Sequence, residues 1–304
     1  MRNRILEISE SPCRLRVERK QLVVDQERER DGLFPVTVPL EDIAAVVVAH
    51  PQVSYTQAVL SELAERGAAF ITCNRNRVPV GILLPLDGHS VQTERFHRQL
   101  QLKQPQKKRI WQQIVKSKIE MQARLLKEVH GDGCGLPPLI PLVRSGDTTN
   151  VEARAARRYW AELFGKDFRR DVDADNQNRF LNYGYAVLRA AAARAVTAAG
   201  LHPSLGVHHH NKYNAWCLAD DVMEPFRPVV DRVVVELMKS DGPSAEMDQS
   251  IRARLIGCLL HRIFIHDQQR TVLDALNIMS ASLADAMSRS EAELSLPQEF
   301  ARAA

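Results

Sequence analysis

The pattern of hydrophobic positions changes character near residue 90. Before that point, apolar and β-branched residues form short runs separated by turn-forming residues, which is typical of strands. These runs lie at 5–8, 13–17, 21–24, 36–38, 43–49, 68–72 and 80–84. The run at 43–49 is apolar almost throughout, which predicts a strand buried on both faces of its sheet. Residues 54–66 interrupt the strands with helical spacing, and Gly67 stands where a helix would end.

Beyond residue 90, apolar residues recur at helical spacing over longer stretches. One predicted helix buries Ile110, Ile114, Met121 and Leu125, and its other face carries Lys107, Lys108, Lys116, Lys118 and Lys127. Residues 131–141 hold three glycines and three prolines, which predict an exposed loop. Further helices are predicted at 182–199, 215–223, 229–239, 247–264 and 271–288. The sequence therefore predicts an α+β protein, with a small N-terminal β-sheet domain at 1–90 and a larger C-terminal all-α domain at 91–304.

Composition narrows the class of protein. The chain has 304 residues and 45% hydrophobic content, enough for one large or two moderate domains. It offers no signal-peptide pattern and no apolar stretch of about 18 residues for a membrane span. The five cysteines are widely spaced, which argues against a disulfide framework or a zinc knuckle. We expect a soluble cytoplasmic protein with reduced thiols.

Charge is distributed unevenly along the chain. The formal net charge is only +4, yet residues 95–126 carry nine lysines and arginines against the single acid Glu120. A concentrated basic segment suits phosphate contacts, which release condensed counterions. A solvated helix face would explain the same run of charges. The charge pattern alone therefore does not decide between a phosphate-binding surface and a solvated helix face.

Two separated motifs supply the candidate chemistry. Glu152 follows Asn150, a plausible N-cap, and lies in the first turn of a predicted helix, where the helix dipole favours a carboxylate. The second motif holds three consecutive histidines, His208, His209 and His210, followed by the acids Asp220, Asp221 and Glu224. Carboxylates favour hard divalent cations and Mn²⁺ tolerates an imidazole, so two glutamates and one histidine could hold Mg²⁺ or Mn²⁺.

Each residue also has a purely structural interpretation. Glu152 could simply complement its helix dipole, and the histidines could be a surface loop. Arg227 could satisfy one of the clustered carboxylates by an ordinary salt bridge. Pro225 and Pro228 predict that the helix bends or stops around Glu224, placing that side chain at a helix end.

At these motifs the sequence strongly resembles the CRISPR adaptation integrase family, which installs new spacers in CRISPR arrays as part of antiviral defence. The likeness spans nearly the whole chain. The form Gly-x-His-His with Asp-Asp-x-Met-Glu-Pro-Phe-Arg-Pro looks like the type II branch, which operates beside an RNA-guided effector nuclease. Further matching runs lie at 43–48, 53–55, 70–74, 79–86, 88–90 and 92–96.

The resemblance implies a metal site at Glu152, His209 and Glu224, with His208 and Asp221 as possible auxiliary ligands. It implies Mg²⁺- or Mn²⁺-dependent attack of a prespacer 3′-hydroxyl on a phosphodiester at the repeat boundary. It also implies a homodimer formed through the N-terminal domain, which contacts a small companion subunit in a heterohexamer on double-stranded DNA. The candidate DNA contacts are Lys107, Lys108, Arg109, Lys116, Arg158 and Lys212.

Two other functions are compatible with the same residues. One is a stand-alone metal-dependent nuclease or phosphohydrolase, in which water replaces the 3′-hydroxyl as nucleophile. The other is a non-enzymatic DNA-binding scaffold, in which the histidines and acids have structural roles.

Overall fold

The N-terminal strands form two sheets. The computed structural model describes residues 4–26, 35–85, 88–289 and 293–301. One sheet has the order β1-β5-β7-β8 and the other β4-β3-β2-β6. The strands of the first sheet are β1 (Arg4–Ile8), β5 (Ile43–Val48), β7 (Ala69–Cys73) and β8 (Pro79–Leu83). Those of the second are β4 (Val36–Pro39), β3 (Gln21–Gln26), β2 (Cys13–Glu18) and β6 (Val53–Tyr55).

Strand β5 lies between two hydrophobic cores, which explains its continuous apolar run. All six of its residues are buried, as the sequence predicts. Because side chains alternate across a strand, Val46 and Val48 join the core of the second sheet, whereas Ala45 and Val47 join the core of the helices. Helix α1 (Gln57–Glu65) closes the smaller core through Val59 and Leu63.

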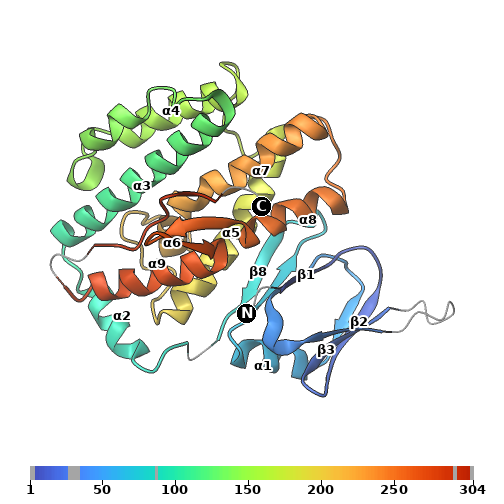
Figure 1. Cartoon of the computed structure of the whole chain (residues 1–304). Coiled ribbons are helices and arrows are strands. Elements are labelled where there is room, and N and C mark those ends of the chain that lie inside the picture. The colour runs from blue at the N-terminus through green and yellow to red at the C-terminus, as the bar shows by residue number, and fades with distance from the viewer. Residues whose placement is uncertain (1–3, 27–34, 86–87, 290–292, 302–304) are drawn as a thin grey trace.

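The remaining chain is mainly helical, so the α+β class is confirmed (Figure 1). Helices α3 and α4 lie beside one another at one side of the molecule, and the N-terminal sheets lie at the other. Among the described helices, none combines the length and apolar character needed to cross a bilayer. The helices are α2 (Gln92–Leu100), α3 (Gln104–His130), α4 (Val151–Phe164), α5 (Gln177–Ala198), α6 (Cys217–Met223), α7 (Arg227–Ser240), α8 (Gln249–Gly257) and α9 (Val272–Ala286).

The C-terminal part is not all-α, which corrects the sequence prediction. The predicted helix at 247–264 ends at Gly257, and β9 (Arg262–Ile265) pairs with β10 (Gln268–Thr271) and β11 (Glu299–Phe300). His266 and Asp267 join β9 to β10 with φ values of 49° and 58°. Two left-handed residues match the twist of a tight hairpin. Sequence reasoning misses this turn because no glycine marks it.

Side chains tie the two parts of the chain together. Arg252 of α8 is only 1% exposed, and its guanidinium lies 2.9 Å from Glu7 Oε1 of β1 and 3.1 Å from Glu10 Oε1. Ala45 and Ile71 of the first sheet pack in the same core as the helices. The predicted division of the chain at residue 90 stays a prediction, and these contacts connect the two sides of it.

Candidate active site

Two glutamates from distant parts of the chain converge on one lysine. Lys118 Nζ of α3 lies 2.5 Å from Glu152 Oε1 and 2.6 Å from Glu224 Oε2. The side chain of Lys118 is only 12% exposed, and that of Glu224 is 5% exposed. The structure therefore brings together the two carboxylates that the sequence singled out, around a single positive charge.

Helix α4 positions Glu152, although its N-terminus is capped differently from the prediction. Asn150 has left-handed backbone angles and makes no side-chain cap. Instead, the carboxylate of Asp147 accepts hydrogen bonds from the backbone N–H groups of Val151 and Glu152, both at 2.9 Å. An acidic cap also complements the helix dipole. Asp147 thus fixes the first turn of α4 and, with it, the backbone of Glu152.

Glu224 lies where the chain turns from α6 into α7, as Pro225 predicts. A short 3-10 turn, Glu224–Phe226, separates the two helices. Arg227 Nη2 lies 2.9 Å from Glu224 Oε1, so the salt bridge considered as a structural alternative is present. Although burial opposes it, the positive charges of Arg227 and Lys118 lower the pKa of Glu224 to about 2. Glu224 is therefore ionised at neutral pH despite its burial.

Lys118 is the site residue that sequence reasoning places wrongly. The charge pattern assigns it to the solvent-exposed face of its helix, and it points instead at the two glutamates. Its position gave a signal, because it lies seven residues after the buried Trp111 and three before the buried Met121. Those spacings place a side chain on the same helix face. A lysine on an apolar stripe indicates a buried anionic partner.

The histidine motif forms a loop held by Asp221. The Asp221 carboxylate accepts hydrogen bonds from the backbone N–H groups of Val207 at 2.6 Å, His208 at 3.0 Å and His209 at 3.1 Å. Nδ1 of His209 lies 2.7 Å from Asp221 Oδ1. Gly206 is required here, because a Cβ at that position would lie 2.1 Å from the carbonyl oxygen of His209. Asp221, predicted as a possible ligand, has both oxygens engaged in positioning this loop.

The two candidate histidines have different surroundings. The hydrogen bond to Asp221 raises the pKa of His209 against the opposing effect of burial. It commits Nδ1, so Nε2 is the ring nitrogen that could bind a cation. His208 instead stacks on Trp111, with ring centroids 4.0 Å apart and an interplanar angle of 2°. Burial lowers the pKa of His208. The geometry favours His209 as the ligand and gives His208 a packing role.

The donor set fits a hard divalent cation, although the described residues contain no preassembled cluster of three or more His, Cys, Asp or Glu ligands. Oε2 of Glu224 is buried and, among the described groups, has an ion pair with Lys118 but no hydrogen bond of good geometry. A buried carboxylate oxygen needs a cationic partner, which Lys118 supplies here and a hard divalent cation could also supply. After the hydrogen bond to Asp221, the negative charge of Glu224 is among the effects that raise the pKa of His209.

The predicted DNA contacts do not form one continuous group. Lys107 and Lys212 line a groove of about 370 Å³ together with His209, His210 and Asn211. Lys116 lies beside Glu120 and Glu293 in a different hollow, and Arg158 donates a hydrogen bond to the carbonyl of Gly135. Lys108 and Arg109 are exposed on α3. The groove that includes His209 is therefore the part of this set that lies at the candidate site.

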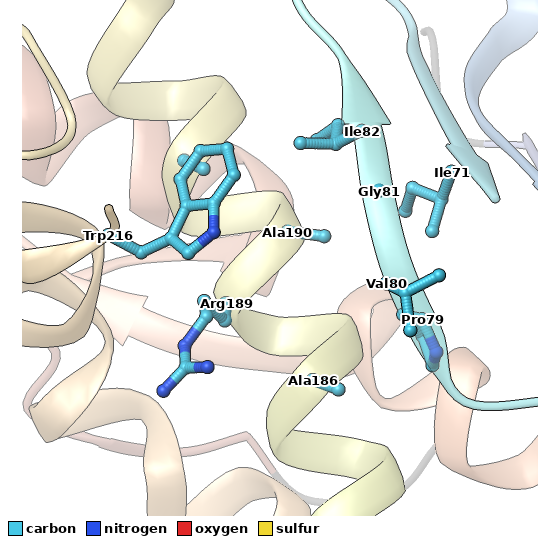
Figure 2. Close-up of a pocket in the computed structure, with 10 residues that line it drawn as sticks. Ile71, Pro79, Val80, Gly81, Ile82, Ala186, Arg189, Ala190 and Trp216 are labelled. Carbon is cyan, nitrogen blue, oxygen red and sulfur yellow. The ribbon is translucent and has the colours of Figure 1, made fainter. Parts of the chain in front are cut away.

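A second cavity, of about 170 Å³, lies between β8 and α5 (Figure 2). Ile82 and Ile71 come from the sheet, Ala190 from α5, and Trp216 from the loop before α6. Arg189, the charged residue among the described ones that line it, pairs with Asp220 at 2.6 Å. This cavity includes none of the predicted ligands, so we place the candidate site at the carboxylates.

Solved structures share this fold over nearly the whole chain. A casposase bound to its integration product matches with a TM-score of 0.78 at 17% identity, covering 96% of this chain and 93% of that one. A Cas1 protein from Thermotoga maritima matches with a TM-score of 0.68 at 16% identity, covering 94% and 97%. At such identities the likeness shows the fold alone.

Sequence relatives define the family. The family described as CRISPR associated protein Cas1 matches residues 6–136 and 143–263. The CRISPR-associated endonuclease Cas1 of Neisseria meningitidis is 39% identical over 288 residues, which are 94% of this chain and 93% of that protein. A second such protein, from Pyrobaculum aerophilum, is 26% identical over 87% of this chain and 96% of its own length. With the predicted motifs and fold in place, these matches establish that the chain belongs to the CRISPR-associated Cas1 family.

Proposed function

We propose that this protein is a metal-dependent integrase that joins prespacer DNA to a CRISPR array. Members of its family are CRISPR-associated nucleases and integrases, so the chain is an enzyme of that class. In the proposed reaction, a 3′-hydroxyl oxygen attacks the phosphorus at the repeat boundary and the bond to the original 3′-oxygen breaks. One phosphodiester replaces another, so the exchange needs no external energy source.

The observation that carries this proposal is the convergence of Glu152 and Glu224 on one cation position. These carboxylates and Nε2 of His209 would hold Mg²⁺ or Mn²⁺. When bound, the ion would polarise a phosphoryl oxygen and stabilise developing negative charge. Asp221 orients His209 through Nδ1, and Arg227 keeps Glu224 ionised. The chain's own residues thus supply a pre-oriented set of donors.

DNA would reach this site along the groove that contains Lys107 and Lys212. Both lysines line the same hollow as His209, so a phosphate backbone lying there would pass beside the proposed ligand. Contacts of this kind hold a duplex without reading its sequence. Recognition of the repeat would then depend on DNA shape and deformability.

The proposed partners are a second copy of the chain and a small companion subunit, assembled as a heterohexamer on double-stranded prespacer and repeat DNA. A structural neighbour described as a Cas6-RT-Cas1–Cas2 complex supports the companion subunit, with a TM-score of 0.67 over 95% of this chain. The casposase bound to an integration product supports a joining reaction. We propose the N-terminal sheets as the surface for both protein contacts. Association with the RNA-guided effector is a separate expectation from the type II resemblance.

The test is a supercoiled-plasmid assay with a labelled duplex, the companion subunit and Mn²⁺ or Mg²⁺. We expect label to enter the plasmid with wild-type protein and not with Glu152→Gln, which keeps the size of the side chain but removes its charge. A matched control is Glu162→Gln, an exposed glutamate on the same helix.

The products separate the competing functions. Plasmid nicking without joined label would show hydrolysis by a stand-alone nuclease. Full joining by Glu152→Gln would contradict a catalytic role for that carboxylate. DNA binding by the wild type with neither joining nor nicking would instead indicate a non-enzymatic DNA-binding scaffold.

A further inference from the structure

We propose that the Lys118 ammonium and a divalent cation are alternative occupants of the space between Glu152 and Glu224. Lys118 would act as a built-in counter-ion that keeps the empty site assembled and is displaced when metal binds. This inference rests on the proposed function, because it assumes that these two glutamates are metal ligands.

The geometry supports a single shared position. Nζ of Lys118 lies 2.5 Å from Oε1 of Glu152 and 2.6 Å from Oε2 of Glu224, so it bridges one oxygen of each carboxylate. Mg²⁺ bound to the same oxygens would lie about 2.1 Å from each. Both cations would then occupy nearly the same point, where their charges repel strongly. One must leave for the other to enter.

Without a bound metal ion, the two glutamates need a counter-ion. The Glu152 and Glu224 side chains are 25% and 5% exposed, and two carboxylates held this close repel each other when neither is paired. Arg227 contacts only the other oxygen of Glu224, Oε1, so it cannot bridge the pair. Among the described residues, Lys118 is the cation that contacts both glutamates.

Lysine suits a displaceable counter-ion. Its four-carbon stem is flexible and its ammonium is a compact point charge, so it can withdraw without moving the backbone. Helix α3 is anchored independently on both sides of Lys118, by the buried side chains of Ile114 and Met121. Displacement would therefore move a side chain and leave the helix in place.

The test measures Mn²⁺ binding to the full-length protein without DNA, by titration calorimetry and by the paramagnetic resonance signal of free Mn²⁺. Lys118→Met retains the length of the side chain and removes its charge. We expect it to bind Mn²⁺ at least about tenfold more tightly than the wild type, because a competing cation has been removed. Lys127→Met, on the exposed face of the same helix, should leave the affinity unchanged.

A second measurement follows the melting temperature in EDTA. Lys118→Met should melt below the wild type because two glutamates are left without their bridge, and adding Glu152→Gln to it should recover part of the loss. Mn²⁺ should raise the melting temperature of Lys118→Met more than that of the wild type. If Lys118→Met does not fold without metal, recovery by the double variant still reports on the same repulsion.

The outcomes separate this inference from the proposed function. Mn²⁺ binding that disappears in Glu152→Gln but is unchanged or weaker in Lys118→Met would overturn the role of Lys118 and leave the metal site intact. Binding seen only after Lys118→Met would support displacement. If neither protein binds Mn²⁺ at millimolar concentration, the metal site and the competition both fail.

Discussion

Nδ1 of His209 lies 2.7 Å from Oδ1 of Asp221, a residue with no exposed side-chain surface. The same carboxylate accepts three backbone N–H groups from residues 207–209. Asp221 therefore fixes both the path of the histidine loop and the direction of the His209 ring. A buried carboxylate behind a histidine is the arrangement that orients a metal-binding imidazole.

Replacing Asp221 should damage stability and activity together. In Asp221→Ala, three backbone donors and the imidazole lose a charged acceptor, which should cost on the order of 3 kcal/mol or more in unfolding free energy. Asp221→Asn should cost less because it retains one acceptor oxygen. Chemical denaturation and DNA cleavage would measure the two effects. Asp285→Asn, at an exposed position, is the control. An unaltered Asp221→Ala protein would contradict the positioning role.

The two histidines should respond differently to substitution. We expect His209→Ala to lower the rate of DNA cleavage at least about 100-fold. Losing a residue that only orients a metal ligand costs up to about 100-fold in activity, and losing a ligand itself should cost no less. His208→Ala should retain more activity and instead lose stability, because its ring stacks on Trp111. Cleavage rates and melting temperatures of both variants would test this. Greater loss of activity in His208→Ala would reverse the assignment.

The buried carboxylate of Asp231 should give a distinctive pH dependence. Burial raises its pKa to about 6, against hydrogen bonds from Tyr159 and Tyr185 that favour the charged form. The folded state therefore takes up this proton at higher pH than the unfolded chain. As pH falls through about 6 towards 4, the proton stabilises the folded protein, by about 3 kcal/mol over the whole window.

The measurement compares the unfolding free energies of wild type and Asp231→Asn from about pH 7.5 to about pH 4.5. Taking the difference cancels groups that titrate equally in both proteins. We expect the wild type to gain relative to Asp231→Asn as pH falls. A relative loss would mean that the pKa of Asp231 is lowered in the folded state instead.

Close packing of α5 should make Gly184 intolerant of a side chain. A Cβ there would lie 2.4 Å from Cγ1 of Val230 on α7. Gly184→Ala should therefore destabilise the fold by roughly 1–3 kcal/mol through overpacking. Gly257→Ala is the matched control, because its Cβ would meet no heavy atom of the described structure within 4 Å. Calorimetric melting of both variants checks the contrast, and equal melting temperatures would refute it.

Salt dependence should reveal the groove that holds Lys107 and Lys212. Replacing both lysines with alanine should weaken DNA binding and reduce the slope of log affinity against log salt by about two, because each lysine neutralises about one phosphate. The control removes two exposed lysines outside the groove, Lys127 and Lys239. Fluorescence anisotropy at several salt concentrations would measure the slopes. Identical slopes for the groove and control variants would place the duplex elsewhere.

Much of the fold follows from local patterns. Strand β5 is predictable because it is a continuous apolar run, and helix α3 because its apolar residues recur at helical spacing over a long stretch. Strand β6 has only three residues, and the β9–β10 hairpin turns without a glycine, so neither gives a local signal strong enough to predict. The sequence favours Asn150 as the cap of α4 because it adjoins the helix, whereas the structure uses the more distant Asp147.

The candidate site also has features that the sequence predicts and features that only the tertiary structure shows. Residue type and motif single out Glu152, Glu224 and a run of three histidines. The resemblance selects His209 among them and assigns the three residues a shared role that remains a proposal. The sequence by itself determined which side chains could bind a hard cation, and it placed Glu152 in the first turn of a helix and Glu224 at a helix end. Only the tertiary structure decided that Lys118 bridges the two glutamates and that Asp221 lies behind His209. Lys118 is 34 positions from Glu152 and 106 from Glu224, and His209 is 12 positions from Asp221. The packing of separate elements, which local periodicity does not encode, sets the distances between them.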